Sequence, residues 1–176
     1  MKTILNARQL EITVDRLCHQ LIENHGDFSN TVLLGLQPRG VWLGNRIYNH
    51  LQPLLPGADI RYGKIDITFY RDDFSKKGKH IPVPNETTIK FPIENKRIVL
   101  IDDVLYTGRS TRAALDAMLD FGRPSSVELL ALIDRRFSRE LPIQATYVGR
   151  TVDANVTENV RVLWTERDGR DEVVLE

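Results

Sequence analysis

The segment 97–122, RIVLIDDVLYTGRSTRAALDAMLDFG, carries the pattern that decides the fold. Residues 97–101 are almost wholly apolar and predict a buried strand, and the DDVLYTG that follows predicts a turn. The stretch RSTRAALDAMLDFG has the apolar spacing of a helix, which Gly122 and Pro124 bring to an end. A buried strand, a tight turn and a helix form the unit from which parallel sheets are built.

The same unit recurs on both sides of this segment. Residues 31–36 (TVLLGL) predict a strand, 37–40 (QPRG) a tight loop, and the residues after Gly40 a helix. Further predicted elements are a helix over 7–24, strands over 60–70 and 126–133, and shorter strand-like pieces within 140–176. Apolar strands that alternate with helices indicate an α/β fold, a parallel sheet core with helices on both faces. Ligands of such sheets bind at the carboxyl ends of the strands.

One long connection interrupts the regular pattern. Residues 71–90 contain few candidates for the core and many Lys, Asp and Pro residues. A connection of this length inside a compact domain is usually functional or mobile. We therefore expect a flexible loop over about 71–90 within a single domain, residues 1–176.

Composition excludes several classes of protein. The 176 residues carry 24 Lys+Arg and 24 Asp+Glu, so a net charge of zero gives no general case for a nucleic-acid or membrane-surface protein. A single cysteine cannot form an intramolecular disulfide, and no apolar run is long enough to span a membrane. We expect a cytoplasmic protein without membrane contact.

The acidic pair Asp102 and Asp103 falls at the predicted carboxyl end of a strand, next to the start of a helix. The N–H groups of a turn that enters a helix, together with the hydroxyls of Thr107, Ser110 and Thr111, can bind a phosphate. The two carboxylates suit vicinal hydroxyls or a hydrated Mg²⁺. Either half alone could be a plain strand end or helix cap, but their joint occurrence favours a sugar phosphate as ligand.

A family resemblance rests on several motifs. The stretch VLIDDVLYTGRST resembles the thirteen-residue motif with which type I phosphoribosyltransferases bind phosphoribosyl pyrophosphate (PRPP). IDITFYRDDFSKK, DDVLYTGRSTRAALDAM, FGRPSSVEL and RELPI are similar to the family of pyrimidine operon attenuators that are also uracil phosphoribosyltransferases. The resemblance implies the type I phosphoribosyltransferase fold, with a small hood subregion over about 134–176.

The family resemblance also implies roles for residues of the PRPP site. Asp102 and Asp103 match the acids that hold the ribose hydroxyls and, through water or PRPP, Mg²⁺. Pro38, Arg39 and Gly40 match the pyrophosphate loop, in which the family usually has Thr-Arg-Gly. Together with Arg39, the two acids are the candidate catalytic residues. The predicted PRPP-binding residues after the acids are Val104, Leu105, Tyr106, Thr107, Gly108, Arg109, Ser110 and Thr111.

Two further regions are assigned by the resemblance. The flexible loop that closes over the site would include Arg71, Asp72, Asp73, Lys76 and Lys77. The base would be bound near Asp134, Arg135 and Val160. The family's usual D-R-G-H-R-E is D-R-R-F-S-R-E in this chain, one residue longer and without the His.

The function implied is conversion of uracil and PRPP to UMP and pyrophosphate with Mg²⁺, by a homo-oligomer such as a dimer or tetramer. One alternative is an RNA-binding attenuator of pyrimidine genes with vestigial catalysis and UMP as effector. Another is a purine phosphoribosyltransferase, but Tyr106 stands where those enzymes usually carry an Asp that acts on the purine N7. Arg135, Arg136 and Arg139 could contact RNA, yet they lie close to acids, so we expect weak or absent sequence-specific RNA binding.

Overall fold

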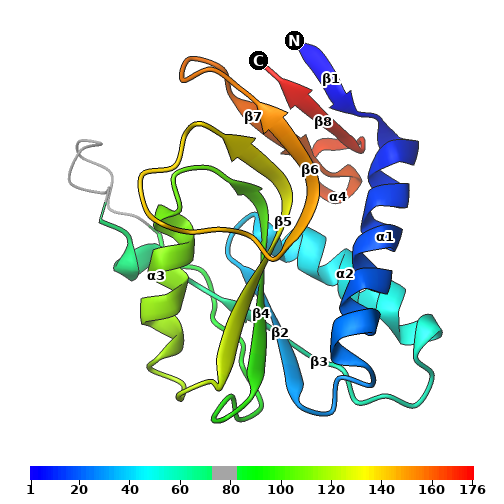
Figure 1. Ribbon diagram of the computed structural model, residues 1–176, viewed down its shortest axis with the longest axis vertical. Coiled ribbons are helices and arrows are strands. Elements are labelled where there is room, and N and C mark those ends of the chain that lie inside the picture. Colours follow the sequence, from blue (N-terminus) through cyan, green and yellow to red (C-terminus); the bar gives the residue numbers. More distant parts are fainter. Residues whose placement is uncertain (73–82) are drawn as a thin grey trace.

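The computed structural model describes residues 1–72 and 83–176, which form two sheets with helices around the larger one (Figure 1). The larger sheet is parallel throughout and has the strand order β3-β2-β4-β5-β6. The smaller sheet is antiparallel, with the order β1-β8-β7. The elements are β1 Lys2–Leu5, α1 Ala7–His25, β2 Thr31–Leu36, α2 Gly40–Leu54, β3 Arg61–Ile65, the 3-10 helix η1 Thr68–Tyr70, β4 Arg97–Leu105, α3 Arg109–Met118, β5 Ser126–Arg136, β6 Tyr147–Asp153, β7 Val160–Leu163, α4 Thr165–Asp168 and β8 Glu172–Leu175. The predicted α/β fold is confirmed.

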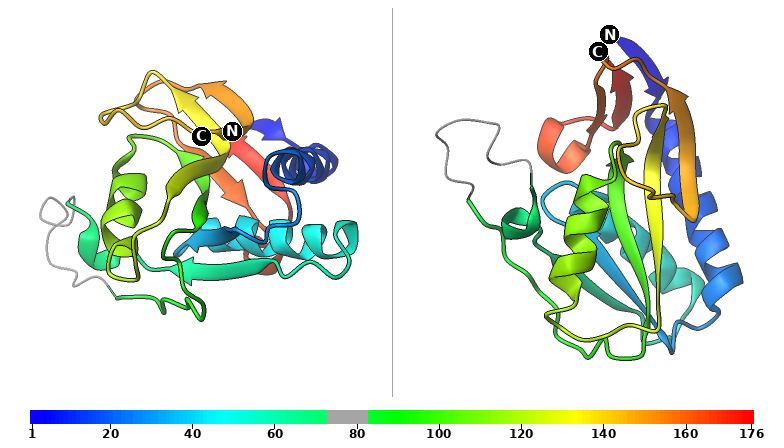
Figure 2. Two further views of the ribbon diagram at one scale, coloured as in Figure 1. Left: turned by 60° about the horizontal axis from the view of Figure 1, so that its bottom comes forward. Right: turned by 60° about the vertical axis from the view of Figure 1, so that its left-hand side comes forward.

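Helices cover both faces of the parallel sheet. In the right-hand view of Figure 2, α3 lies on one side of the strands and α1 on the other. The strands are apolar on both faces for this reason: Val99 and Ile101 of β4 belong to the core under α1 and α2, and Ile98 and Leu100 to the core under α3.

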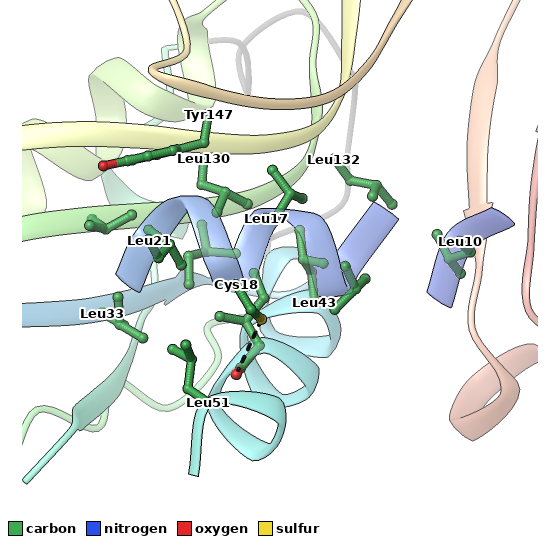
Figure 3. Packing of buried hydrophobic residues seen from close by; sticks show 14 of the residues in the cluster. Leu10, Leu17, Cys18, Leu21, Leu33, Leu43, Leu51, Leu130, Leu132 and Tyr147 are labelled. Atoms are coloured by element: carbon green, nitrogen blue, oxygen red, sulfur yellow. Dashed lines mark hydrogen bonds between the residues drawn. The ribbon is translucent and has the colours of Figure 1, made fainter. Parts of the chain in front are cut away.

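The helix α1 begins and ends where its sequence requires. Asn6 and Gln9 form a capping box, in which each side chain accepts a hydrogen bond from the other residue's backbone N–H. Its buried stripe packs on the sheet and on α2, as Figure 3 shows for Leu17 and Leu21. Cys18 lies in the same stripe with its Sγ 3.9 Å from the carbonyl oxygen of Ile47, and burial raises the pKa of the thiol to about 12. The cysteine is therefore an inert packing residue.

Several element boundaries differ from the sequence expectation. β4 continues through the acidic pair to Leu105, because residues 102–105 still pair with β5. β3 ends at Ile65, and the short helix η1 replaces the second half of the predicted strand. α3 ends at Met118, four residues before the glycine that was expected to end it.

The predicted hood, about 134–176, spans both sheets in the structure. β6 pairs with β5 and forms an edge of the parallel sheet. Only β7 and β8 belong to the small sheet, and its third strand is the N-terminal β1. Sequence analysis missed β1, since four residues are too few to show a period. Arg46 of α2 forms ion pairs with Glu166 and Asp171 at 2.7 Å and so connects the segment between β7 and β8 to a helix of the parallel sheet.

The far end of the predicted flexible loop is attached to the sheet. Thr88 exchanges two backbone hydrogen bonds with Lys64 of β3, and the Thr87 hydroxyl oxygen accepts one from the N–H of Asp66. Ile93 is fully buried in the core under α3. Of the predicted loop residues, Asp73, Lys76 and Lys77 lie outside the described ranges. None of the described helices is long and apolar enough to cross a membrane.

Candidate functional site

The acidic pair lies in the part of β4 that extends beyond the end of its neighbour β2. β2 ends at Leu36, and its last partner in β4 is Ile101. β4 continues through Asp102 and Asp103, which are left without a strand on the β2 side. The loop between β2 and α2 fills this position. The structure thus brings residues 38–40 and the two acids together, as the sequence predicted.

Arg39 connects the acids to the small sheet. Its Nε donates a hydrogen bond to Oδ2 of Asp103 at 2.9 Å, and its Nη2 donates one to the carbonyl oxygen of Val162 in β7 at 2.7 Å. Asp103 is buried, with 4% of its surface exposed. A buried carboxylate needs such a partner, because an unpaired charge is costly to remove from water. The remaining N–H groups of the guanidinium can bind phosphate oxygens.

Asp102 is in a different electrostatic position. Its Oδ1 accepts a hydrogen bond from the backbone N–H of Asp103 at 2.9 Å. Burial, and next the charge of Asp103, raise the pKa of Asp102 well above its usual range, while the charge of Arg71 acts in the opposite direction. A cation or a hydroxyl donor bound here would relieve this cost.

Gly40 permits the close approach of the loop to the acids. A Cβ at this position would lie 2.3 Å from the carbonyl oxygen of Ile101 and 3.2 Å from Oδ1 of Asp102. No side chain fits in this space, so glycine is required at the first residue of α2. The preceding Gln37–Pro38 peptide bond is cis.

The predicted phosphate loop, residues 106–111, runs from the end of β4 into α3. Gly108 has a φ of 94°, which favours glycine, and is the residue before the helix. Thr111 is buried, and Ser110 accepts a hydrogen bond at its Oγ from Nη1 of Arg71 at 3.3 Å. The Thr107 hydroxyl oxygen accepts one from the N–H of Arg109 at 3.3 Å.

Residues 36–39, Arg71, the acids and Ser110 surround a small cavity. Its volume is about 120 Å³, and its lining residues are Leu36, Gln37, Pro38, Arg39, Ile67, Arg71, Asp102, Asp103, Val104 and Ser110. The two acids, two arginines and a serine hydroxyl provide both the anion-binding and the hydroxyl-binding groups that a sugar phosphate requires.

Arg109 has a role that the PRPP motif does not indicate. Its guanidinium forms ion pairs with Asp72 at 2.6 Å and Glu140 at 2.7 Å. Arg112 also reaches Asp72, at 3.2 Å. The described start of the predicted flexible loop is thus attached to the first turn of α3.

The three predicted base-binding residues make different contacts in the structure. Arg135 is buried, donates hydrogen bonds to the carbonyl oxygens of Asn155 and Glu158, and places its Cζ 4.0 Å from the centre of the Tyr106 ring. Asp134 forms an ion pair with Arg139 at 2.5 Å. Val160 lies in β7, but the residue of this strand that contacts Arg39 is Val162. The assignment of these residues to the base stays a prediction.

Sequence reasoning missed the roles of Arg139, Glu140 and Val162. The motif D-R-R-F-S-R-E offers a signal, since Arg139 and Glu140 correspond to the last two residues of the family pattern. Between Arg135 and Arg139 the chain passes through the exposed residue Phe137, which has a φ of 64°. Val162 acts through its backbone carbonyl, which no sequence pattern reveals.

Comparisons with known proteins identify the family of the chain. The family model described as "Phosphoribosyl transferase domain" matches residues 1–167. Relatives named "Bifunctional protein PyrR" include one from Desulfosudis oleivorans, 46% identical over 98% of this chain and 94% of its own. Another, from Caldicellulosiruptor bescii, is 45% identical over 99% of this chain and 94% of its own.

Solved structures agree in fold. The hypoxanthine phosphoribosyltransferase of Trypanosoma cruzi superimposes with a TM-score of 0.73 at 13% identity, covering 99% of this chain and 95% of that one. A hypoxanthine-guanine phosphoribosyltransferase from Bacillus anthracis gives 0.65 at 16% identity, covering 87% and 83%. At this identity they show the fold alone. The family model matches most of the chain, and the PyrR relatives are similar along its whole length. The chain therefore belongs to the phosphoribosyltransferase family, as a relative of the bifunctional PyrR proteins.

Proposed function

We propose that this protein transfers the phosphoribosyl group of PRPP to uracil, which gives UMP and pyrophosphate. The observation that carries the proposal is the meeting of Asp102, Asp103, Arg39 and the start of α3 around one cavity. The high identity to proteins named "Bifunctional protein PyrR" along the whole chain supports this enzyme class.

In the proposed reaction, N1 of uracil bonds to C1′ of the ribose while the bond from C1′ to the pyrophosphate oxygen breaks. The electron pair of that bond leaves with the pyrophosphate, and the pyrophosphate or solvent water takes up the N1 proton. The protein acts by positioning and by stabilising charge, with no covalent intermediate. Asp102 and Asp103 would hold the ribose hydroxyls, and the N–H groups at the start of α3 would hold the 5′-phosphate. Arg39 would meet the pyrophosphate with its remaining N–H donors as negative charge develops there.

The donor set at the acids fits a magnesium ion. Mg²⁺ prefers oxygen ligands and is commonly held by one or two carboxylates together with substrate phosphates. Asp102 and Asp103 are adjacent carboxylates, and the pKa of Asp102 is raised first by burial and then by the charge of Asp103, two costs of the ionised form that a cation would offset. Bound there, Mg²⁺ would supply neutralising charge for the pyrophosphate.

The base is assigned from Tyr106. A phenol cannot act as the carboxylate that the purine enzymes of this fold use at that position, which supports a pyrimidine. The ring of Tyr106 has Arg135 against it at 4.0 Å and is itself partly exposed. We therefore place the uracil on the Tyr106 side of the acids.

Radiolabelled uracil, hypoxanthine and guanine, each incubated with PRPP and Mg²⁺, test the proposal. We expect UMP from uracil, and we expect Asp102→Asn and Asp103→Asn each to lower kcat/KM for PRPP by about a hundredfold. Asp59→Asn, at an exposed acid away from the acidic pair, is the control and should retain activity. Faster turnover of a purine would refute the base assignment, and no turnover of any base would refute the enzyme.

A second candidate function is regulation through RNA, and the word "Bifunctional" in the names of the relatives says that those proteins have two functions. The arginines of residues 135–139 do not form a free basic patch: Arg135 is buried, Arg136 is bonded to Asp153 at 2.6 Å, and Arg139 is bonded to Asp134. We expect weak or absent binding of a pyrimidine leader RNA in fluorescence titrations near physiological salt, with or without UMP. Tight, UMP-enhanced binding that Arg136→Ala weakens would contradict this expectation.

A further inference from the structure

The backbone of the phosphate loop is held from outside by one neighbouring segment, residues 134–141, which we call the supporting segment. The carbonyl oxygen of Tyr106 accepts a hydrogen bond from Nη1 of Arg139. The carbonyl oxygen of Thr107 accepts two, from the N–H groups of Glu140 at 3.0 Å and Leu141 at 3.1 Å. Two successive carbonyls of the loop therefore face the supporting segment.

This arrangement fixes the direction of the next N–H groups. In a trans peptide the carbonyl oxygen and the following N–H point in opposite directions. The N–H groups of Thr107 and Gly108 must therefore point away from the supporting segment. Within residues 1–72 and 83–176, neither N–H has a protein acceptor. Two donors are thus oriented together at the start of a helix, which is what a phosphate requires.

The supporting segment is itself anchored to the sheet. Arg139 forms an ion pair with Asp134 at 2.5 Å, and Asp134 pairs in register with Leu105 at the end of β4. Arg139 thus joins the ends of β4 and β5 across the base of the loop. A Cβ at Gly108 would lie 3.0 Å from Cγ1 of Ile143 and 3.4 Å from Cβ of Leu141, so the loop also packs directly against the end of the segment and the residues that follow it.

We infer that Arg139 is a positioning residue for the 5′-phosphate: it holds the Tyr106–Thr107 peptide so that the loop N–H groups face the phosphate. The inference rests on the proposed function. The contacts of Arg136 and Arg139 distinguish two arginines that look equivalent in the sequence. Arg136 forms its ion pair with Asp153 on the exposed edge of the sheet and does not contact the loop, whereas Arg139 bonds to a loop carbonyl.

The test compares Arg139→Gln, Arg139→Lys and the matched control Arg136→Gln. Calorimetric titration with ribose 5-phosphate measures binding of the phosphate without the reaction, and steady-state assays give KM for PRPP and for uracil. We expect Arg139→Gln to raise the dissociation constant and KM for PRPP roughly tenfold to a hundredfold, the loss that removal of a charged hydrogen-bond donor causes. KM for uracil at saturating PRPP should change little.

Arg139→Lys keeps the charge and one donor, so it should fall between wild type and Arg139→Gln, and it remains informative if the Gln variant does not fold. Arg136→Gln should match wild type. Wild-type affinity in both Arg139 variants, an equal loss in Arg136→Gln, or no binding of ribose 5-phosphate to the wild type would overturn the inference. If the wild type binds ribose 5-phosphate and Arg139→Gln weakens it, but no UMP forms, the inference holds and the proposed uracil reaction fails.

Discussion

Asp102 and Asp103 are adjacent in the sequence but contribute to stability with opposite signs. Asp103 is buried and paired with Arg39, so its charge is compensated. Asp102 has a pKa raised first by burial and then by the charge of Asp103. An acid whose pKa is higher in the folded than in the unfolded state stabilises the fold only at low pH, and this contribution is lost as the pH rises through the folded-state value. At neutral pH, Asp102 therefore makes the folded state less stable than it is at low pH.

We expect Asp102→Asn to raise the free energy of unfolding at pH 7, by about 0.5–2 kcal/mol, while it lowers activity. An amide removes the charge and keeps an oxygen that accepts the N–H of Asp103. Urea unfolding at several pH values measures the effect, and the gain should shrink as the pH falls toward about 4, where carboxylates are protonated in the unfolded chain. Asp103→Asn is the control and should destabilise, because it leaves Arg39 without its partner. Destabilisation by both substitutions would show that Asp102 carries no such cost.

At the scale of elements, the sequence predicted the strands and helices that have strong apolar patterns. The strand 31–36 has its predicted bounds, and α1 begins at the predicted residue and ends one later, because long or fully buried elements leave a clear pattern. β1 was missed, and it is stabilised by pairing with β8 at the other end of the chain rather than by local preference. The motif indicated residues that the structure brings together, since acids, glycine and hydroxyls are chemically distinctive, and their roles in binding stay predictions. Contacts that depend on tertiary structure, such as Arg139 with the Tyr106 carbonyl, have no signature in the motif.

At the scale of the whole molecule, the end of the sheet opposite the acids contains a second polar network. The buried side chain of His25, at the end of α1, lies with Nδ1 2.8 Å from the Thr31 hydroxyl and Nε2 2.8 Å from Oε2 of Glu128. The Tyr147 hydroxyl donates to the same Glu128 oxygen at 2.9 Å, and Arg97 reaches Oε1 at 3.3 Å. The network joins α1 to β2, β4, β5 and β6 at the edge where these strands begin. It has no contact with substrate in the proposed reaction, so its effect is on stability.

This network should make stability depend on pH below neutrality. Burial lowers the pKa of His25, and the charge of Arg97 adds to this, while Glu128 opposes it. A histidine with a lowered folded-state pKa binds its proton more readily in the unfolded chain, so the free energy of unfolding should fall as the pH drops below about 6.5. One such proton gives a slope of up to about 1.4 kcal/mol per pH unit. Burial alone would raise the pKa of Glu128, but its hydrogen bonds and the neighbouring positive charges outweigh burial and lower the pKa. Glu128 would therefore reduce the free energy of unfolding only below about pH 4.5.

Urea unfolding between pH 7.5 and about pH 5 therefore isolates the histidine, because the carboxylates remain ionised in the unfolded chain over most of that range. His25→Gln should lose stability at pH 7.5 through its lost buried hydrogen bonds, and its stability should then change less with pH than that of the wild type. His19→Gln, at a histidine whose side chain is 56% exposed, is the matched control and should keep the wild-type slope. Parallel pH profiles for the wild type and His25→Gln would show that the buried imidazole does not set the acid sensitivity of the fold.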